Sequence, residues 1–263
     1  MTKNFNTQFL KGRWTMTIWE MGVAGATSLN RGRARSPMGL VKTSLRDGKF
    51  ARDLGKLVAR LSEGLPPEVR TELDLLMDKL IWLHEEGRVK INHSAMELVC
   101  ARELLLMGYS VDVEHEIGGL TCDVYAEVDG HSLVVEIETG FVPPEHALDP
   151  LTYCRARVAS KIARYGCLAD RFALGLPPHY LAIIPSAFLK EGRERGEEEV
   201  KRIKALCDYY YHNPPVSEDE ILRARLDWIL VVDVDALSAK MMSPRAYAEL
   251  SRHVLARLGI KTI

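Results

Sequence analysis

The clearest pattern in this chain is an alternation of apolar and polar positions in its middle third. A period of two is typical of strands, because successive side chains of a strand point to opposite faces of a sheet. Gly118-Gly119 and Asp129-Gly130 separate the alternating segments and are typical of turns. The pattern therefore predicts three consecutive strands, at residues 109–117, 120–128 and 132–138.

Periods near 3.6 on both sides of these strands predict helices. One helix is expected from about Ser94 to Met107. A second is expected from Pro150 to Tyr165, where proline after Asp149 is a strong start signal. The remaining pattern predicts a helix at 69–85, strands at 180–184 and 228–234, a charged helix at 191–202 and a final helix.

This order of elements predicts an α/β fold with a mixed central sheet flanked by helices. The expected division is a partly helical, basic N-terminal region at 1–90 and a core at 91–263. Composition agrees with a globular protein, since 47% of the 263 residues are hydrophobic and 27% are charged. No apolar stretch is long enough for a membrane helix, and residues 1–10 lack the apolar core of a signal peptide, so we expect a soluble cytoplasmic protein.

The five cysteines contain no CxxC pair, so free buried thiols are favoured over a zinc site. Charge is distributed unevenly along the chain. Residues 31–60 carry nine basic and two acidic side chains, whereas the whole chain has a net charge of -1. Such a segment is typical either of an arm that binds phosphate groups or of a solvated stretch without a partner. The sequence leaves both interpretations open.

Three acidic residues are predicted to meet on one face of the central hairpin. A two-residue turn at Asp129-Gly130 pairs Val128 with His131, and the same register places Asp123 opposite Glu136. Glu138 lies two residues further and therefore shares their face. Like charges across a strand pair are destabilising, so a divalent cation held by these oxygens is the favoured interpretation.

The alternative is a solvated hairpin face on which the repulsion is tolerated in water. Val134 and Tyr125 argue against it, because they make the carboxylate face apolar as well. Leu133, Val135 and Ile137 give the other face a core-like pattern. A strand that is buried on both faces is a poor place for acids without a partner.

Two flanking helices each add a candidate. Glu97 shares its side of the helix with Cys100 and Leu104, which favours a buried site, although Ser94 to Glu97 also fits a capping box. Lys161 lies at the edge of the apolar stripe of the second helix, from where its ammonium can reach the margin of the sheet. The alternative is that the Lys161 side chain simply extends into solvent.

The order of Glu97 on a helix, Asp123 on a strand and Glu136-Ile137-Glu138 on the paired strand resembles the PD-(D/E)xK nuclease superfamily. This superfamily includes restriction endonucleases and archaeal Holliday-junction resolvases. The resemblance covers about residues 92–185. Cys122 stands where proline is usual, and Glu138 replaces the usual lysine. Some restriction enzymes are similar to this ExE variant, and in other members a lysine on the following helix, here Lys161, takes over.

The resemblance implies a restriction-endonuclease-like fold and a metal-dependent nuclease that hydrolyses phosphodiester bonds in DNA. It implies that Mg²⁺, or Mn²⁺ in its place, is bound by Glu97, Asp123, Glu136 and the carbonyl of Ile137. The metal would lower the pKa of a bound water and polarise the phosphate.

In this scheme Asp123 and Glu136 are also catalytic residues, Glu138 positions or deprotonates the water, and Lys161 offsets charge on the phosphate. Arg155, Arg157 and Arg164 would hold the nucleic-acid backbone. Members that make double-strand cuts are often homodimers. The alternatives are a catalytically inactive protein of this fold that binds DNA or a protein partner, and a structural protein whose acids are only solvated.

Overall fold

The structure, a computed structural model, describes residues 48–257 and 259 of the chain. Six strands form one mixed sheet in the order β1-β2-β3-β4-β5-β6. Their bounds are β1 Ser110–Ile117, β2 Leu120–Val128, β3 His131–Ile137, β4 Arg171–Leu176, β5 Trp228–Asp233 and β6 Ser238–Met242. The β3–β4 and β4–β5 pairs are parallel and the other pairs are antiparallel. The expected α/β class with a mixed central sheet flanked by helices is confirmed.

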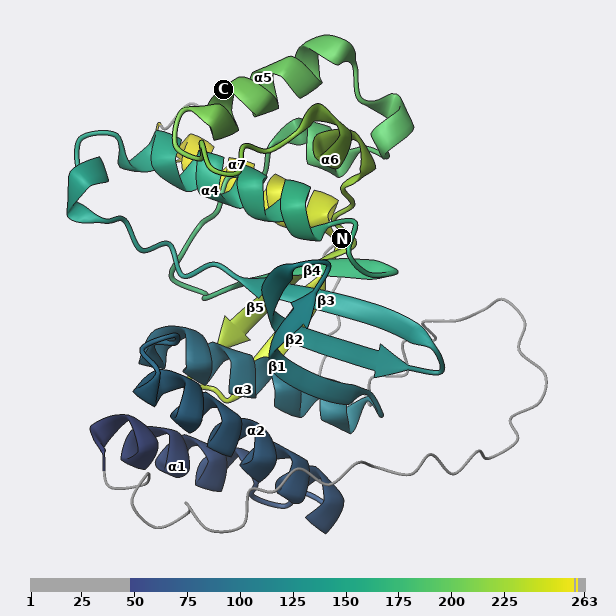
Figure 1. Cartoon of the computed structure of the whole chain (residues 1–263). Coiled ribbons are helices and arrows are strands. Elements are labelled where there is room, and N and C mark those ends of the chain that lie inside the picture. The colour runs from purple at the N-terminus through teal and green to yellow at the C-terminus, as the bar shows by residue number, and fades with distance from the viewer. Residues whose placement is uncertain (1–47, 258, 260–263) are drawn as a thin grey trace, which may run out of the picture. The chain divides into compact units, whose positions relative to one another are not determined.

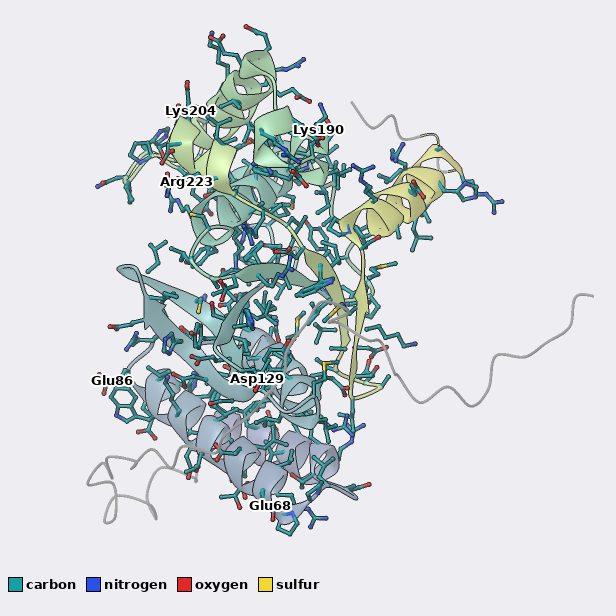
Figure 2. The ribbon with its side chains drawn as sticks, turned by 90° about the vertical axis from the view of Figure 1, so that its right-hand side faces the viewer. Glu68, Glu86, Asp129, Lys190, Lys204 and Arg223 are labelled. Carbon is teal, nitrogen blue, oxygen red and sulfur yellow. The ribbon has the colours of Figure 1, made fainter. Side chains whose placement is uncertain are left out.

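Helices cover both faces of the sheet (Figure 1). One layer holds α1 Lys49–Leu61, α2 Pro67–Glu85 and α3 Ile91–Leu106; the other holds α4 Pro150–Tyr165, α5 Glu197–Asp208, α6 Glu218–Arg223 and α7 Pro244–Arg257. Short 3-10 helices lie at Pro144–His146, Ser186–Leu189 and Gly192–Glu194. Figure 2 gives a second view, with Glu68 and Glu86 in the first layer and Lys190 and Lys204 in the second.

Each face of the sheet has its own hydrophobic core. Leu133, Val135 and Ile137 of β3 pack into the cluster that also contains the apolar residues of α1, α2 and α3. Val134 points the other way and packs with the residues of α4, including Ile162. The prediction that this strand is buried on both faces is confirmed, and its carboxylates are therefore held away from water.

The helices α1 and α2 share a continuous core with α3 and the sheet. Apolar residues of α1 recur at helical spacing and are buried, as Leu54 and Leu61 illustrate. Part of the predicted N-terminal region is thus packed directly against the core that carries the candidate site. Residues 1–47, which include the first half of the basic segment, lie outside the described residues.

The predicted strand at 180–184 is wrong, and the fourth strand is instead β4 at Arg171–Leu176. Prolines at 177, 178 and 185 flank the predicted segment, and proline restricts its neighbours and cannot donate to a ladder. The amide of Ala182 donates to the hydroxyl of Tyr247 rather than to a neighbouring strand. The sequence of β4 is a short apolar run of the kind typical of a buried parallel strand.

Several other boundaries differ from the expectations. α3 begins at Ile91 rather than near Ser94, and the charged run at 191–202 becomes a helix only from Glu197. Strand β6 and helix α6 were not predicted, because both are short. By contrast, α4 spans Pro150–Tyr165 as expected, and β2 has its predicted bounds.

The cysteines agree in part with the expectation of buried free thiols. All five are free, and Cys100, Cys122 and Cys207 are buried, whereas Cys154 and Cys167 are only partly buried. Within residues 48–257, none of the helices has both the length and the apolar character that a membrane crossing requires.

Replacing Leu54 by alanine tests whether α1 belongs to the core. Leu54 is fully buried, so Leu54→Ala should lower the free energy of unfolding by about 2–5 kcal/mol, the usual cost of a large-to-small core substitution. Urea titration followed by circular dichroism measures it. The control is Leu75→Ala, because Leu75 on α2 is 51% exposed. Equal and small losses in both variants would contradict the packing of α1.

Candidate active site

The predicted hairpin register holds along the paired part of β2 and β3. Val128 pairs with His131, and the ladder continues in the same register to Val124 and Val135. One residue further, Asp123 and Glu136 leave the regular ladder and bond through their side chains. The amide of Asp123 donates to Glu136 Oε1 at 3.1 Å, and the amide of Ile137 donates to Asp123 Oδ2. The two carboxylates therefore meet where the hairpin strands open.

Lys161 on α4 contacts both of these carboxylates. Its Nζ lies 2.9 Å from Glu136 Oε2 and 3.3 Å from Asp123 Oδ2, and it donates to the carbonyl of Ile137 at 2.6 Å. Only 16% of the Lys161 side chain is exposed, so the ion pairs are largely screened from water. The sequence left open whether this ammonium reaches the margin of the sheet or extends into solvent, and the structure brings it into contact with the acids.

The pKa values of these groups follow from burial and from their mutual charges. Burial opposes ionisation of Asp123, but Lys161, His93 and the amide of Ile137 together outweigh it and lower the Asp123 pKa to about 2. Burial and the charge of Asp123 raise the Glu136 pKa to about 8, against the influence of Lys161. Burial alone would lower the Lys161 pKa, yet the carboxylates hold it above its ordinary value. One ammonium thus stabilises only one of the two carboxylates as an anion.

Glu97 lies on α3 and is fully buried. Neither of its carboxylate oxygens has a hydrogen-bond partner within residues 48–257. The capping-box explanation is wrong, because the helix begins three residues before Ser94 and its N-cap is Lys90. Burial, reinforced by the charge of Asp123, raises the Glu97 pKa well above its ordinary value. A buried acid without a partner is costly, so this position calls for a ligand or a proton.

A set with metal-ligand geometry surrounds this acid. His93, Glu97 and Asp123 each offer one ligand atom, and these three atoms lie within 4.8 Å of one another. His93 precedes Glu97 by four residues on α3, so both side chains lie on the same face of the helix. His93 Nδ1 also lies 3.7 Å from Asp123 Oδ1. An imidazole with two carboxylates suits a small divalent cation, and the unpartnered oxygens of Glu97 fit that use.

This set contains two of the four predicted ligands and adds one that the sequence reasoning missed. Glu136 and the Ile137 carbonyl contact Lys161 instead. The spacing of four residues between His93 and Glu97 on the buried side of α3 is the signal that could have found His93. The metal role of all four predicted groups stays a prediction.

A further acid, Glu114 on β1, was also missed. The β1–β2 ladder pairs Val113 with Val124 and His115 with Cys122, which leaves Glu114 opposite Asp123 without a backbone pair. Glu114 has a positive φ of 46°, a backbone conformation that non-glycine residues rarely adopt. Burial, followed by the charge of Asp123, raises its pKa. Glu114 thus adds both a rare backbone conformation and a further acidic group beside Asp123.

Glu138 is buried, and both of its oxygens have partners. Arg157 Nε donates to Oε2 at 2.6 Å, and the amide of Gly140 donates to Oε1 at 2.9 Å. This ion pair links α4 to the loop that leaves β3. Burial would lower the Arg157 pKa, but Glu138 raises it. The predicted role of Glu138 in positioning a water stays a prediction.

The three arginines proposed to hold a nucleic-acid backbone do not gather at one place. Arg157 binds Glu138 as described above. Arg164 donates to the carbonyl of Pro214 and lies over the ring of Tyr211. Arg155 lines a separate cavity between helices of the same layer. Their predicted role in binding nucleic acid stays a prediction.

The raised pKa of Glu136 predicts how stability depends on pH without metal. Between its unfolded value near 4.5 and its folded value of about 8, the folded state holds a proton that the unfolded state has lost. Unfolding midpoints measured in EDTA should therefore fall as pH rises from 5 to 8. Glu136→Gln should flatten this slope, since its amide cannot titrate. An identical slope in wild type and variant would contradict the assignment.

Comparisons with protein-family models, curated proteins and solved structures found no match for this chain. The candidate site therefore rests on its own geometry. It combines a fully buried carboxylate without a hydrogen-bond partner among residues 48–257, a ligand set of His93, Glu97 and Asp123, and an ammonium between Asp123 and Glu136.

Proposed function

We propose that this protein is a divalent-metal-dependent nuclease that hydrolyses phosphodiester bonds in DNA. The observation that carries the proposal is the buried carboxylate of Glu97, whose two oxygens have no partner among the described residues and lie beside Asp123 and His93. Folding buries the Glu97 carboxylate, and a negative charge there would have no compensating partner. A divalent cation that binds to this carboxylate removes that energetic cost.

The order of the elements supports a restriction-endonuclease-like fold. Helix α3 carries Glu97, the antiparallel strands β1 to β3 follow, and α4 with Lys161 crosses over to the parallel strand β4. This is the order that the resemblance to the PD-(D/E)xK superfamily implies, with Lys161 in place of the lysine that Glu138 replaces. The site lies at the carboxyl end of β3.

The side chains have separable tasks in the proposed reaction. His93, Glu97 and Asp123 would hold Mg²⁺ or Mn²⁺, which supplies an activated water and neutralises charge on the scissile phosphate. Lys161 keeps Asp123 ionised and places a positive charge where the phosphate gains negative charge. Glu136 Oε1 accepts a hydrogen bond from the backbone amide of Asp123 and so fixes the position of Asp123 relative to Glu136.

Nucleic acid as the partner is supported by the basic face of α1. Lys49, Arg52, Lys56 and Arg60 follow one another at spacings of three and four residues, and all four are exposed. The apolar residues of the helix lie on the opposite side, in the core. The described part of the basic segment is therefore an ordered stripe of positive charge, which suits a row of phosphates.

A second function, binding without cleavage, is favoured by the position of Lys161. Its ammonium contacts Asp123 Oδ2, Glu136 Oε2 and the Ile137 carbonyl. These are three of the groups that the resemblance assigns to the metal. A protein that had lost its metal at these groups would need a positive charge such as this ammonium in its place. An active enzyme instead needs the metal ion at His93, Glu97 and Asp123.

The cleavage assay separates the two functions. Circular, linear, single-stranded and branched DNA are incubated with Mg²⁺ or Mn²⁺, and with EDTA as the blank. Wild type should cut at least one substrate only with metal. Asp123→Asn and Glu97→Gln should each slow cleavage by about a hundredfold or more, since even loss of groups that support metal ligands typically costs 10–100-fold.

Glu103→Gln is the matched control, because Glu103 lies on the same helix as Glu97 and pairs with Arg102 away from the proposed metal ligands. It should cut as fast as wild type. Cleavage that persists in Asp123→Asn and Glu97→Gln would contradict the proposed metal site. If wild type retains DNA but cuts none of the substrates, the second function replaces the first.

The stripe on α1 predicts the salt dependence of binding. In EDTA, the double variant Lys49→Gln, Lys56→Gln should bind DNA more weakly. Its slope of log affinity against log salt should be shallower by about 2, because each released phosphate contact contributes about 0.9 for duplex DNA. Fluorescence anisotropy measures both quantities. The double variant Lys201→Gln, Lys240→Gln removes the same charge from other exposed positions. An equal effect of the two variants would refute a specific role of α1.

A further inference from the structure

Four aromatic rings, of His146, Tyr153, Tyr209 and Tyr210, form an aromatic cluster around the start of α4. The rings of His146 and Tyr153 are stacked, with 4.3 Å between their centroids. Tyr210 meets both of them edge-on, at 5.1 and 5.5 Å, and Tyr209 meets Tyr210 at 4.8 Å. The rings come from the loop after β3, from α4 and from the end of α5. Three separate segments of the chain therefore build one aromatic surface.

Hydrogen bonds join the aromatic cluster to the candidate active site. Arg157 donates Nε to Glu138 at 2.6 Å and Nη1 to the hydroxyl of Tyr153 at 3.3 Å. Glu138 follows Glu136 by two residues, and Lys161 lies one turn beyond Arg157 on α4. A nucleic acid with its scissile phosphate at the site would therefore bring its neighbouring nucleotides close to these rings.

The outer side of this region exposes large apolar side chains to solvent. Tyr209 is 69% exposed, and Phe141, in the same loop as His146, is 61% exposed. Leu148 is fully exposed, and Leu151 in the first turn of α4 is half-exposed. Exposed apolar side chains that gather in one region are typical of a binding surface, because water solvates them poorly.

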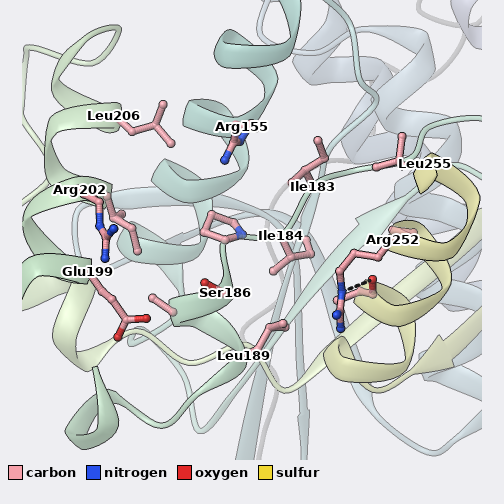
Figure 3. Close-up of a pocket in the computed structure, with 15 residues that line it drawn as sticks. Arg155, Ile183, Ile184, Ser186, Leu189, Glu199, Arg202, Leu206, Arg252 and Leu255 are labelled. Atoms are coloured by element: carbon pink, nitrogen blue, oxygen red, sulfur yellow. Dashed lines mark hydrogen bonds between the residues drawn. The ribbon is translucent and has the colours of Figure 1, made fainter. Parts of the chain in front are cut away.

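The cavity between α4, α5 and α7 is a different feature of the same layer (Figure 3). Its wall includes the aliphatic side chains of Ile184, Leu206 and Leu255. Neither Phe141 nor any ring of the aromatic cluster lines it. The exposed rings of Tyr209 and Phe141 therefore belong to the outer surface, where a polymer can lie along them.

Exposed aromatic rings beside a proposed site of phosphodiester cleavage fit the bases of a nucleic acid. A base stacks on an aromatic ring through its flat face, and every base offers such a face. In an intact duplex the faces of each base are covered by its neighbours, so only unpaired bases can stack on these rings.

The charged residues that contact the rings have partners within the protein. Arg157 is paired with Glu138. Asp149 accepts a hydrogen bond from the hydroxyl of Tyr210 and lies 3.8 Å from Nδ1 of His146. This surface therefore differs from the basic stripe of α1, because it would hold a strand by stacking rather than by attraction to phosphates.

We propose that Phe141 and the aromatic cluster bind unpaired bases next to the scissile phosphate. The inference rests on the proposed function and names its substrate class, which is DNA with unpaired nucleotides beside the cut, as in single strands and branched junctions. Tyr209 and Phe141 supply the exposed rings, and the stacked pair of His146 and Tyr153 supports them from inside.

The binding test uses single-stranded DNA in which one base is 2-aminopurine, whose fluorescence falls when it stacks on an aromatic ring. The full-length protein is titrated in EDTA, so that binding is measured without cleavage. Wild type should quench the probe. The double variant Phe141→Ala, Tyr209→Ala should bind the single strand about tenfold more weakly or worse, since two stacking partners are lost. Its affinity for a blunt duplex of the same sequence should equal that of wild type.

Two control variants separate stacking from other effects. Phe141→Tyr, Tyr209→Phe keeps both rings and should bind the single strand as tightly as wild type. Leu250→Ala removes an exposed apolar side chain of α7 and should also bind normally. The salt dependence gives a further readout. Loss of the rings should lower the affinity without changing the slope of log affinity against log salt, because no phosphate contact is removed.

The proposal is overturned if the probe is not quenched, if the double alanine variant binds the single strand like wild type, or if it loses single-strand and duplex binding equally. Sedimentation of both proteins identifies another occupant. A double alanine variant that dissociates a homodimer and leaves single-strand affinity unchanged would assign the surface to a second copy of the chain and refute base binding.

Cleavage with Mg²⁺ or Mn²⁺ distinguishes this proposal from the proposed function. Wild type should cut single-stranded or branched DNA at least about tenfold faster than an intact duplex, and the double alanine variant should lose this preference. A protein that cuts no DNA but quenches the probe through these rings would refute the nuclease and leave the base-binding surface standing. Equal cutting of all substrates by wild type and variant would refute the surface and leave the nuclease standing.

Discussion

The contact of the Lys161 ammonium with Asp123, Glu136 and the carbonyl of Ile137 is the interaction on which this end of the fold depends. It joins α4 to the open end of the β2–β3 hairpin, where two carboxylates are buried side by side. Removing one partner of a buried ion pair typically costs about 3–5 kcal/mol, since the remaining charge has no compensation. The crossover helix thus fixes the geometry of the acids as well as closing the parallel β3–β4 unit.

This ammonium does not balance the whole site. Four acids approach one another here, namely Glu97, Glu114, Asp123 and Glu136, and Lys161 makes hydrogen bonds to two of them. Burial, followed by the charge of Asp123, raises the pKa values of Glu97, Glu114 and Glu136. In such a cluster either protons or a divalent cation must supply the missing positive charge. The oxygens of Glu97 have no hydrogen-bond partner in the described part of the chain and lie beside His93, and this is where we propose that a cation binds.

Much of this arrangement could be predicted from the sequence, because it depends on local rules. The turn at Asp129-Gly130 fixes the hairpin register, and that register brings Asp123 to Glu136. Proline after Asp149 defines the start of α4 and hence the side on which Lys161 lies. In each case a short segment specifies its own geometry, so no knowledge of distant contacts is needed.

The features that escaped prediction depend on tertiary contacts. Glu114 becomes part of the site only because β1 pairs with β2 in a register that sets it against Asp123. The ion pair of Glu138 with Arg157 joins residues 19 positions apart and could not be read from the hairpin alone. Strand β4 was missed for the same reason, because its short apolar run is defined as a strand by its pairing with β3. Sequence patterns specified the elements, and packing selected their partners.

The central claim is that His93, Glu97 and Asp123 together hold a divalent cation, and its most direct test is a crystal of the protein soaked in Mn²⁺. Anomalous diffraction locates manganese without reference to the protein coordinates. The account predicts one strong anomalous peak within coordination distance of a His93 ring nitrogen and of carboxylate oxygens of Glu97 and Asp123. The absence of a peak between these three side chains at saturating Mn²⁺, with Glu97 still buried, would contradict it.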